Sequence, residues 1–478
     1  MKSSSMFLWA SLLMVAIALP SQHVHAQPLA LEDAWQQLRS QDDDVAAGQA
    51  AQQRAVALLS TRNNLLLPQI DLIGSYTHLD NPIEVDALAL NPLSSVADSL
   101  PGQRLVDLIG GPNAFRTPVT NRNVARSSLA MFWPLYTGGK ISSARELLTL
   151  EERAASLLLE DVYRARFMDL VTAYYGLVMA ERALTTQQQA ENTLAHHYHS
   201  AQALEDQYQI ARVERLAAEA AYDRSRITTR AIREQRDSAQ QALASLVHYT
   251  PSNAPGSGGH SSGPTPTSPL FTLASLPPIE HFQPGLADHP VLRLLANKQA
   301  QAESVVDASR GLYHPNVFMF GSYNLYEDDS LASDLTPDWL VGVGVSMPLV
   351  DRSGRSGKVQ AAVSTVSELR YRQQAASRKL ELLLDQQYRD ANQALEEYSD
   401  LASTVALAEE SLRLQTLAFS EGIGRALDVI DAQTFLSTTH TRRDAAAFRF
   451  VMSFAQLLSI TGQQESLFAY LSEGDPIP

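Results

Sequence analysis

Two long stretches of this chain contain almost no residue that breaks a helix. Residues 141–250 hold no proline and a single glycine, and residues 359–471 hold no proline and only Gly422, Gly424 and Gly462. Both stretches are rich in Ala, Leu, Gln, Glu and Arg, which favour the helix. Runs of this length predict helices far longer than the usual three turns. The expected helices span about 141–208, 213–248, 358–420 and 427–461.

Four other segments alternate apolar residues with small or polar ones, which is the period of a β-strand. They span about 69–79, 124–136, 316–326 and 338–349. At roughly ten residues each, they match tilted transmembrane strands of about 9–11 residues better than soluble strands of about 5–6. We expect Met131, Val343 and Val345 to face lipid, and Ser128 and Ser346 to face an interior.

The two halves of the chain repeat one another. Leu67-Pro68-Gln69-Ile70 resembles His314-Pro315-Asn316-Val317, and Trp133-Pro134-Leu135 resembles Met347-Pro348-Leu349. Each half therefore reads as helix, strand, strand, very long helix and medium helix. The predicted repeats span 27–250 and 283–478, with first helices at about 29–66 and 290–311, and a Pro/Gly/Ser-rich connector lies at 251–282.

The first 26 residues predict a secretory signal peptide. Lys2 precedes an uncharged apolar stretch, Met6–Leu19, and Val24-His25-Ala26 fits a cleavage site. No other apolar run approaches the ~18 residues of a transmembrane helix, so we expect an exported chain whose route into a membrane, if it has one, is by strands. Four strands cannot close a barrel, because the smallest membrane barrels use eight, and this predicts an oligomer.

Composition excludes several classes of protein. Lys and Arg total 37 against 52 Asp and Glu, a net charge of −15, which argues against a nucleic-acid partner. The chain has no cysteine, which excludes disulfides, Cys-ligated metals and an N-terminal lipid on cysteine. No Ser/His/Asp constellation or catalytic carboxylate pair stands out. We therefore predict no enzyme, no catalytic residues, no cofactor and no metal site.

A few residue groups invite other interpretations. His196, His197 and His199 could hold a metal ion, but a solvated helix face is the favoured interpretation. Two classes of function stay open on residues alone: a passive export duct, and a periplasmic coiled-coil scaffold without a pore. The scaffold would explain the helices but not four long amphipathic strands.

The chain resembles the TolC-type outer-membrane efflux proteins. The resemblance rests on the doubled element order, on Pro134-Leu135-Tyr136-Thr137-Gly138-Gly139 and on the stretch from Phe419 to Gln433. It implies a mixed α/β membrane protein and a homotrimer. Four strands per protomer would build a twelve-stranded outer-membrane β-barrel, continued by a long periplasmic α-helical barrel.

The resemblance also implies a function and partners. The chain would be the exit duct of a tripartite efflux or type I secretion system in the outer membrane of a Gram-negative bacterium, extending into the periplasm. It would dock on a periplasmic adaptor protein and an inner-membrane pump of the RND, ABC or MFS class. Outer-membrane lipid would surround the strands.

The resemblance places a periplasmic gate at the tips of the helical hairpins. Gly422 and Gly424 would form the tip turn, whereas the first half has no glycine there. The expected gate and selectivity residues are Asp428, Asp431, Glu214, Arg425 and Phe419. In three copies, Asp428 and Asp431 would form two rings of carboxylates that attract cations. The alternative is that these aspartates complement the dipole of the helix that begins near Leu427.

Overall fold

The computed structural model describes residues 28–87, 103, 106–108, 116–249, 263–328, 331–350 and 352–477. The expected signal peptide lies outside these residues. The chain forms two compact units, and each combines segments from both sequence repeats. The first unit takes the chain up to Val45, Tyr163–Leu286 and the chain from Leu383 onward; the second takes Ala46–Val162 and Ala287–Leu382.

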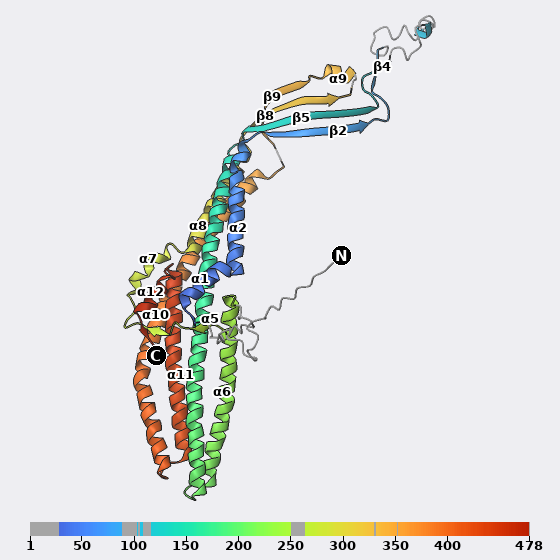
Figure 1. The fold of residues 1–478 in the computed structure, drawn as a ribbon. Coiled ribbons are helices and arrows are strands. Elements are labelled where there is room, and N and C mark those ends of the chain that lie inside the picture. The colour runs from blue at the N-terminus through green and yellow to red at the C-terminus, as the bar shows by residue number, and fades with distance from the viewer. Residues whose placement is uncertain are drawn as a thin grey trace, which may run out of the picture. The chain divides into compact units, whose positions relative to one another are not determined.

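Four helices dominate the fold (Figure 1). They are α5 (Lys140–Asp206, 67 residues), α6 (Arg212–Leu246, 35 residues), α10 (Arg355–Ser420, 66 residues) and α11 (Ala426–Ile460, 35 residues). At 1.5 Å per residue the two longest helices extend about 100 Å. Such helices persist because their sequences lack breakers and because one side of each is buried, as in α5 at Leu170, Tyr174 and Leu177.

Shorter elements complete the two units. The remaining helices are α1 (Leu31–Gln41), α2 (Asp43–Ser60), α7 (Gln283–Leu286), α8 (Pro290–Arg310), α9 (Leu331–Leu335) and α12 (Ser466–Glu473). Within the described residues, no helix is both long enough and apolar enough to cross a bilayer.

The second unit contains a four-stranded antiparallel sheet (Figure 1). Its strands are β2 (Gln69–His78), β5 (Asn123–Tyr136), β8 (Asn316–Glu327) and β9 (Trp339–Ser346), in the order β2-β5-β8-β9. The pairing of β5 with β8 joins the two sequence repeats. Strand β9 ends earlier than the expected residue 349. Pro348 has no N–H to offer a ladder, which accounts for the early end. A small hairpin of β3 (Glu84–Asp86) and β4 (Arg116–Pro118) lies between β2 and β5.

The register of the sheet separates an apolar face from a polar one. Residues directly opposite one another in paired strands share a face. One face carries large apolar side chains: Ile70, Leu72, Leu129, Met131, Trp133, Met319, Val341, Val343 and Val345. The other carries Asp71, Ser128, Ser322, Asn324 and Ser346, together with Ile73, Leu340 and three phenylalanines, Phe132, Phe318 and Phe320. The strands thus alternate as predicted, but the second face is mixed rather than polar throughout. Val343 and Val345 of the apolar face are 60% and 67% exposed in the single chain.

Two short strand pairs lie in the first unit and join residues that are far apart in the sequence. Strand β1 (Pro28–Leu29) pairs with β6 (Thr265–Pro266), and β10 (Asp475–Pro476) pairs with β7 (Phe271–Thr272). The buried Tyr174 hydroxyl donates to the Leu29 carbonyl and accepts from the Ser268 amide, each at 2.8 Å. The part of the predicted connector that follows residue 262 is thus packed against the helices, with Leu270 and Phe271 buried.

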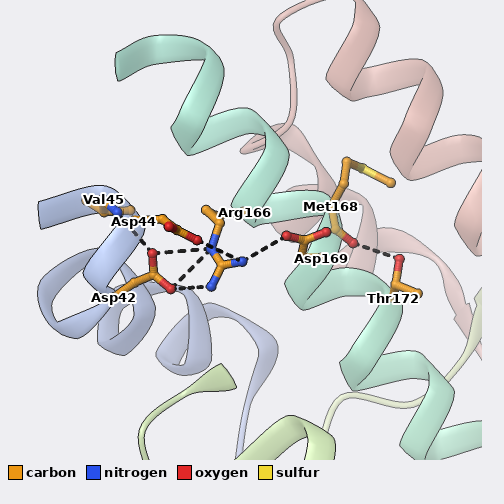
Figure 2. Close-up of polar contacts among 7 residues, drawn as sticks. All are labelled: Asp42, Asp44, Val45, Arg166, Met168, Asp169 and Thr172. Atoms are coloured by element: carbon orange, nitrogen blue, oxygen red, sulfur yellow. Dashed lines mark hydrogen bonds and ion pairs between the residues drawn. The ribbon is translucent and has the colours of Figure 1, made fainter. Parts of the chain in front are cut away.

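The helix expected over 29–66 is interrupted at Asp42, which corrects the prediction of one continuous helix. Asp42 is extended (φ −71°, ψ 130°), and its Oδ1 accepts from the Val45 amide at 3.0 Å, as the N-cap of α2. The same carboxylate pairs with Arg166 of α5 (Figure 2). Arg166 also contacts Asp169 at 3.1 Å and Asp44 at 3.5 Å. The break is therefore held by a helix cap and an ion pair that use one side chain.

Replacing Asp42 tests whether it holds this break. Asp42 is 2% exposed. Asp42→Ala removes the cap and one partner of a largely buried ion pair, so we expect a loss of about 2–4 kcal/mol. The matched control is Asp169→Ala, which removes a half-exposed partner of the same arginine and should cost about 1 kcal/mol or less. Urea unfolding followed by circular dichroism measures both; equal losses would contradict the assignment.

Candidate functional site at the hairpin tips

Both helical hairpins of the first unit turn at the same end of that unit (Figure 1). In the second turn Gly422 adopts φ +75°, and the Ile423 amide donates to the Ala418 carbonyl at 3.0 Å. In the first turn Tyr208 adopts φ +61°, and the Gln209 amide donates to the Leu204 carbonyl at 2.9 Å. The two turns therefore share one geometry, although the first has a tyrosine where the second has glycine.

The second glycine of the tip has a different physical role. Gly424 does not take a positive φ, but a Cβ at this position would lie 2.9 Å from the Phe419 amide nitrogen. Glycine is needed here because the chain passes close to the end of α10. Of the two glycines predicted to form the tip turn, Gly422 supplies the left-handed backbone and Gly424 supplies the close approach.

At the start of α11 the Asp428 carboxylate accepts hydrogen bonds from Arg425, the N-cap residue, so that one predicted site residue caps the helix through another. The Arg425 amide donates to Asp428 Oδ2 at 3.3 Å, and the Arg425 guanidinium donates to Asp428 Oδ1 at 2.8 Å. The Arg425 hydrogen bond and charge lower the pKa of Asp428. Asp428 thus has the structural role that the helix-dipole alternative describes. Asp431, one turn further on, is exposed.

Glu214 reaches across from the first hairpin to the second. It occupies the third position of α6, as Asp428 does in α11, but its Oε2 accepts from the Ala426 amide of α11 at 2.7 Å. Ala426 is the first residue of α11, where amides have no partner within the helix. Glu214 therefore satisfies a free amide and places a negative charge at the positive end of that helix.

A buried histidine binds the same residue from the other side. His197 Nε2 donates to the Ala426 carbonyl at 3.2 Å, since a carbonyl can only accept. Two side chains of the first hairpin thus hold the N–H and the C=O of one residue in the second. We call this arrangement of Glu214, His197 and Ala426 the Ala426 clamp. The expectation of a solvated helix face is wrong for His197, whose side chain is buried at 4% exposure.

Phe419 lies in the core beside the clamp. Its ring is 1% exposed and packs edge-on against the His197 ring, with centroids 4.4 Å apart. Around it are small or branched residues, namely Ala201, Ala218, Ala426 and Val429, all fully buried. Phe419, which was predicted as a gate residue, is thus part of a buried apolar contact between the two hairpins.

The tip combines charges of both signs. Arg425 interacts electrostatically with Glu214, Asp428 and Asp431. On the first hairpin, Arg215 forms ion pairs with Glu205 and Glu219, three residues that no motif of the sequence marks. The structure thus brings four predicted residues, Glu214, Arg425, Asp428 and Asp431, to one end of α11. Within the described residues, no group of three His, Asp or Glu is arranged to hold a metal ion.

Removing the Glu214 carboxylate should free the start of α11. A hydrogen bond to a charged group contributes about 1.5–3 kcal/mol. In Glu214→Ala we therefore expect amide exchange of Ala426–Val429 to be at least roughly tenfold faster in hydrogen–deuterium exchange. Glu219→Ala is the control, because Glu219 lies on the same helix and pairs only with Arg215 among the contacts above. Equal acceleration in both variants would contradict the clamp.

Acid should loosen the tip through His197. Burial lowers the pKa of His197 below its usual 6.5, although the Ala426 hydrogen bond and the Glu214 charge oppose this shift. The folded tip therefore favours the neutral ring. Its contribution to stability is complete above about pH 6.5 and is lost as the pH falls through the lower pKa of the folded state.

We expect exchange of Ala426–Val429, corrected for intrinsic rates, to be faster at pH 5 than at pH 7.5. His197→Gln keeps a donor and should abolish this difference. His196→Gln changes an exposed neighbour and should keep it. A pH effect that persists in His197→Gln would assign the titration to another group.

Comparison with known proteins adds family evidence for the second half of the chain. Residues 283–463 match the family described as outer membrane efflux protein. A curated relative, nodulation protein T of Rhizobium leguminosarum bv. trifolii, is 25% identical over 182 residues. That alignment covers 37% of this chain and 37% of the relative.

Solved structures extend the likeness to nearly the whole chain. VceC of Vibrio cholerae aligns with a TM-score of 0.70 at 14% identity, over 90% of this chain and 96% of that one. The CmeC channel of Campylobacter jejuni gives 0.71 at 13% identity, covering 93% and 88%. The MtrE channel of Neisseria gonorrhoeae gives 0.68 at 18% identity, covering 91% and 89%. The resemblance stated from the sequence is confirmed: the second half of this chain matches the outer membrane efflux protein family, and the chain as a whole has the fold of TolC-type outer-membrane channels.

Proposed function

We propose that this protein is the outer-membrane exit duct of a tripartite efflux or type I secretion system. The observation that carries the proposal is the four-stranded sheet. Its apolar face is exposed in the single chain, its other face mixes polar side chains such as Asp71, Ser128 and Ser322 with phenylalanines, and its strands are 8–14 residues long. An apolar outer face and a polar inner face are what a membrane sheet around an aqueous interior requires.

The sheet also sets the number of copies. Four strands leave two open edges, at β2 and β9. In hydrocarbon an open edge would leave backbone groups without partners, so the sheet must close on itself. We propose a homotrimer of twelve strands, since four strands are too few to close and family members are expected to be trimers. The helices would continue into the periplasm toward an adaptor and an inner-membrane pump of the RND, ABC or MFS class.

Transport through such a duct would be passive, with the hairpin tips as its periplasmic entrance. Asp431 is the predicted ring residue whose carboxylate is exposed and makes no capping bond like that of Asp428. We therefore propose Asp431, rather than Asp428 or Phe419, as a residue lining the constriction. Three copies would place carboxylates around it and favour cations.

The orientation of the sheet can be tested by a pair of substitutions. Val343→Arg puts a charge on the apolar face and should cost about 2–4 kcal/mol near the midplane of the bilayer. Ser128→Arg puts the same side chain on the polar face and should be mild. Urea unfolding from lipid vesicles measures both. Equal cost at the two positions would mean that the apolar face does not meet lipid.

Conductance tests the function itself. The protein should fractionate with the outer membrane, and purified protein in planar bilayers should show discrete, cation-preferring channels. The same protein recovered as soluble rods without conductance would support the periplasmic scaffold instead and would contradict the proposal.

A further inference from the structure

Helix α6 carries an exposed stripe that the single chain leaves uncovered. The stripe follows heptad spacing, in which apolar residues recur at alternating steps of three and four. It contains the three large apolar side chains of α6 that are exposed: Val213 at 66%, Leu216 at 46% and Ile227 at 66%. The full stripe, which we call the α6 stripe, is Val213, Leu216, Ala220, Asp223, Ile227 and Arg230, all exposed.

Helix α10 carries a matching stripe near its end. Of the α10 residues within the first unit, three large apolar side chains are exposed, Leu407 at 71%, Leu414 at 49% and Leu417 at 50%. They lie at heptad spacing on the side of α10 opposite the buried Val405 and Ala408. The full stripe, which we call the α10 stripe, is Asp400, Ser403, Leu407, Glu410, Leu414 and Leu417, all exposed.

The two stripes are in register when measured from their own hairpin turns. Leu216 follows the left-handed Tyr208 by eight residues, and Leu414 precedes the left-handed Gly422 by eight. Val213 and Leu417 each lie five residues from the same points. Because α6 leads away from its turn and α10 leads into its own, an antiparallel pairing with the two turns level would place every stripe member opposite a stripe member.

One charged pair agrees with this pairing, whereas the two other acids of the stripes, Asp223 and Glu410, would face Leu407 and Ala220. Arg230 of α6 would lie opposite Asp400 of α10, and neither side chain forms an ion pair with a described residue of its own chain. The apolar end of the seam, Val213 and Leu216 against Leu417 and Leu414, lies next to the turns. Beyond Arg230 the match ends, since Glu234 would face Glu396.

We propose that the α6 stripe of one copy packs against the α10 stripe of a neighbouring copy as an antiparallel coiled-coil seam in this register. The inference rests on the proposed trimeric duct and names the surfaces that would join its subunits near the periplasmic tip. A second copy is the occupant that explains why two stripes of one chain match each other in spacing and in distance from their turns, with Arg230 opposite Asp400. An outside partner on either stripe would not require that match.

Cysteine cross-linking tests the seam directly, because the natural chain contains no cysteine. Leu216→Cys and Leu414→Cys are introduced into two differently tagged copies that are expressed together. Oxidation, or a short bismaleimide, should then give an adduct carrying both tags, and the double variant should give a ladder up to three chains. The register control pairs Leu216→Cys with Leu407→Cys. That pair is displaced by two turns, about 10 Å, and should give roughly tenfold less adduct.

Each outcome decides the proposal. Adduct in the Leu216/Leu414 pair and little in the control supports the seam. No adduct, or equal adduct in both pairs, overturns it. Light scattering and bilayer conductance of the same variants, measured before cross-linking, distinguish failure of the seam from failure of the proposed duct. A conducting trimer that gives no adduct overturns the seam alone and assigns the stripes to another occupant such as an adaptor. A non-conducting monomer overturns the proposed function as well.

Discussion

Two open strand edges constrain everything else in this molecule. Strands β2 and β9 end the sheet, and each has one side without a partner strand among the residues that the structure describes. In the proposed duct the exposed valines of β9 meet hydrocarbon, where no water could satisfy the free backbone groups of those edges. A single chain would leave both edges unsatisfied there. The proposed copy number above one therefore follows from the sheet.

At the hairpin tips, acidic residues at equivalent positions of the two sequence repeats form different contacts. Asp428 folds back on Arg425 and caps its own helix, whereas Glu214, at the equivalent position of α6, caps the helix of the other hairpin. His197 completes the hold on Ala426. One hairpin thus fixes the start of the other through polar contacts that charge or protonation can weaken. A contact of this kind would suit the proposed role of the tip as a periplasmic entrance.

The regular parts of this fold were predictable from the sequence because they follow period and propensity. Absence of breakers marks the long helices, and alternation marks the strands and their faces. The break at Asp42 was not predicted, because an aspartate within a helix costs little by propensity alone. What decides the break is the distant Arg166.

The tip was predicted in location but not in detail. Leu194, His197 and Ala201 share a buried helical stripe, and this spacing could have marked His197 as a core residue. The clamp itself could not be foreseen, since it joins α5, α6 and α11 through one backbone residue. Phe419 is buried because small residues of three other helices surround it. The local sequence around Phe419 does not show that these helices come together there.

The most direct test of the account is the number of chains in the particle extracted from the outer membrane by detergent. Native mass spectrometry of that particle measures it without reference to any single residue. The proposed duct requires three chains, which supply twelve strands and join six helical hairpins. A particle that contains a single chain would contradict the proposal, because one chain would then tolerate both open sheet edges beside its exposed apolar face.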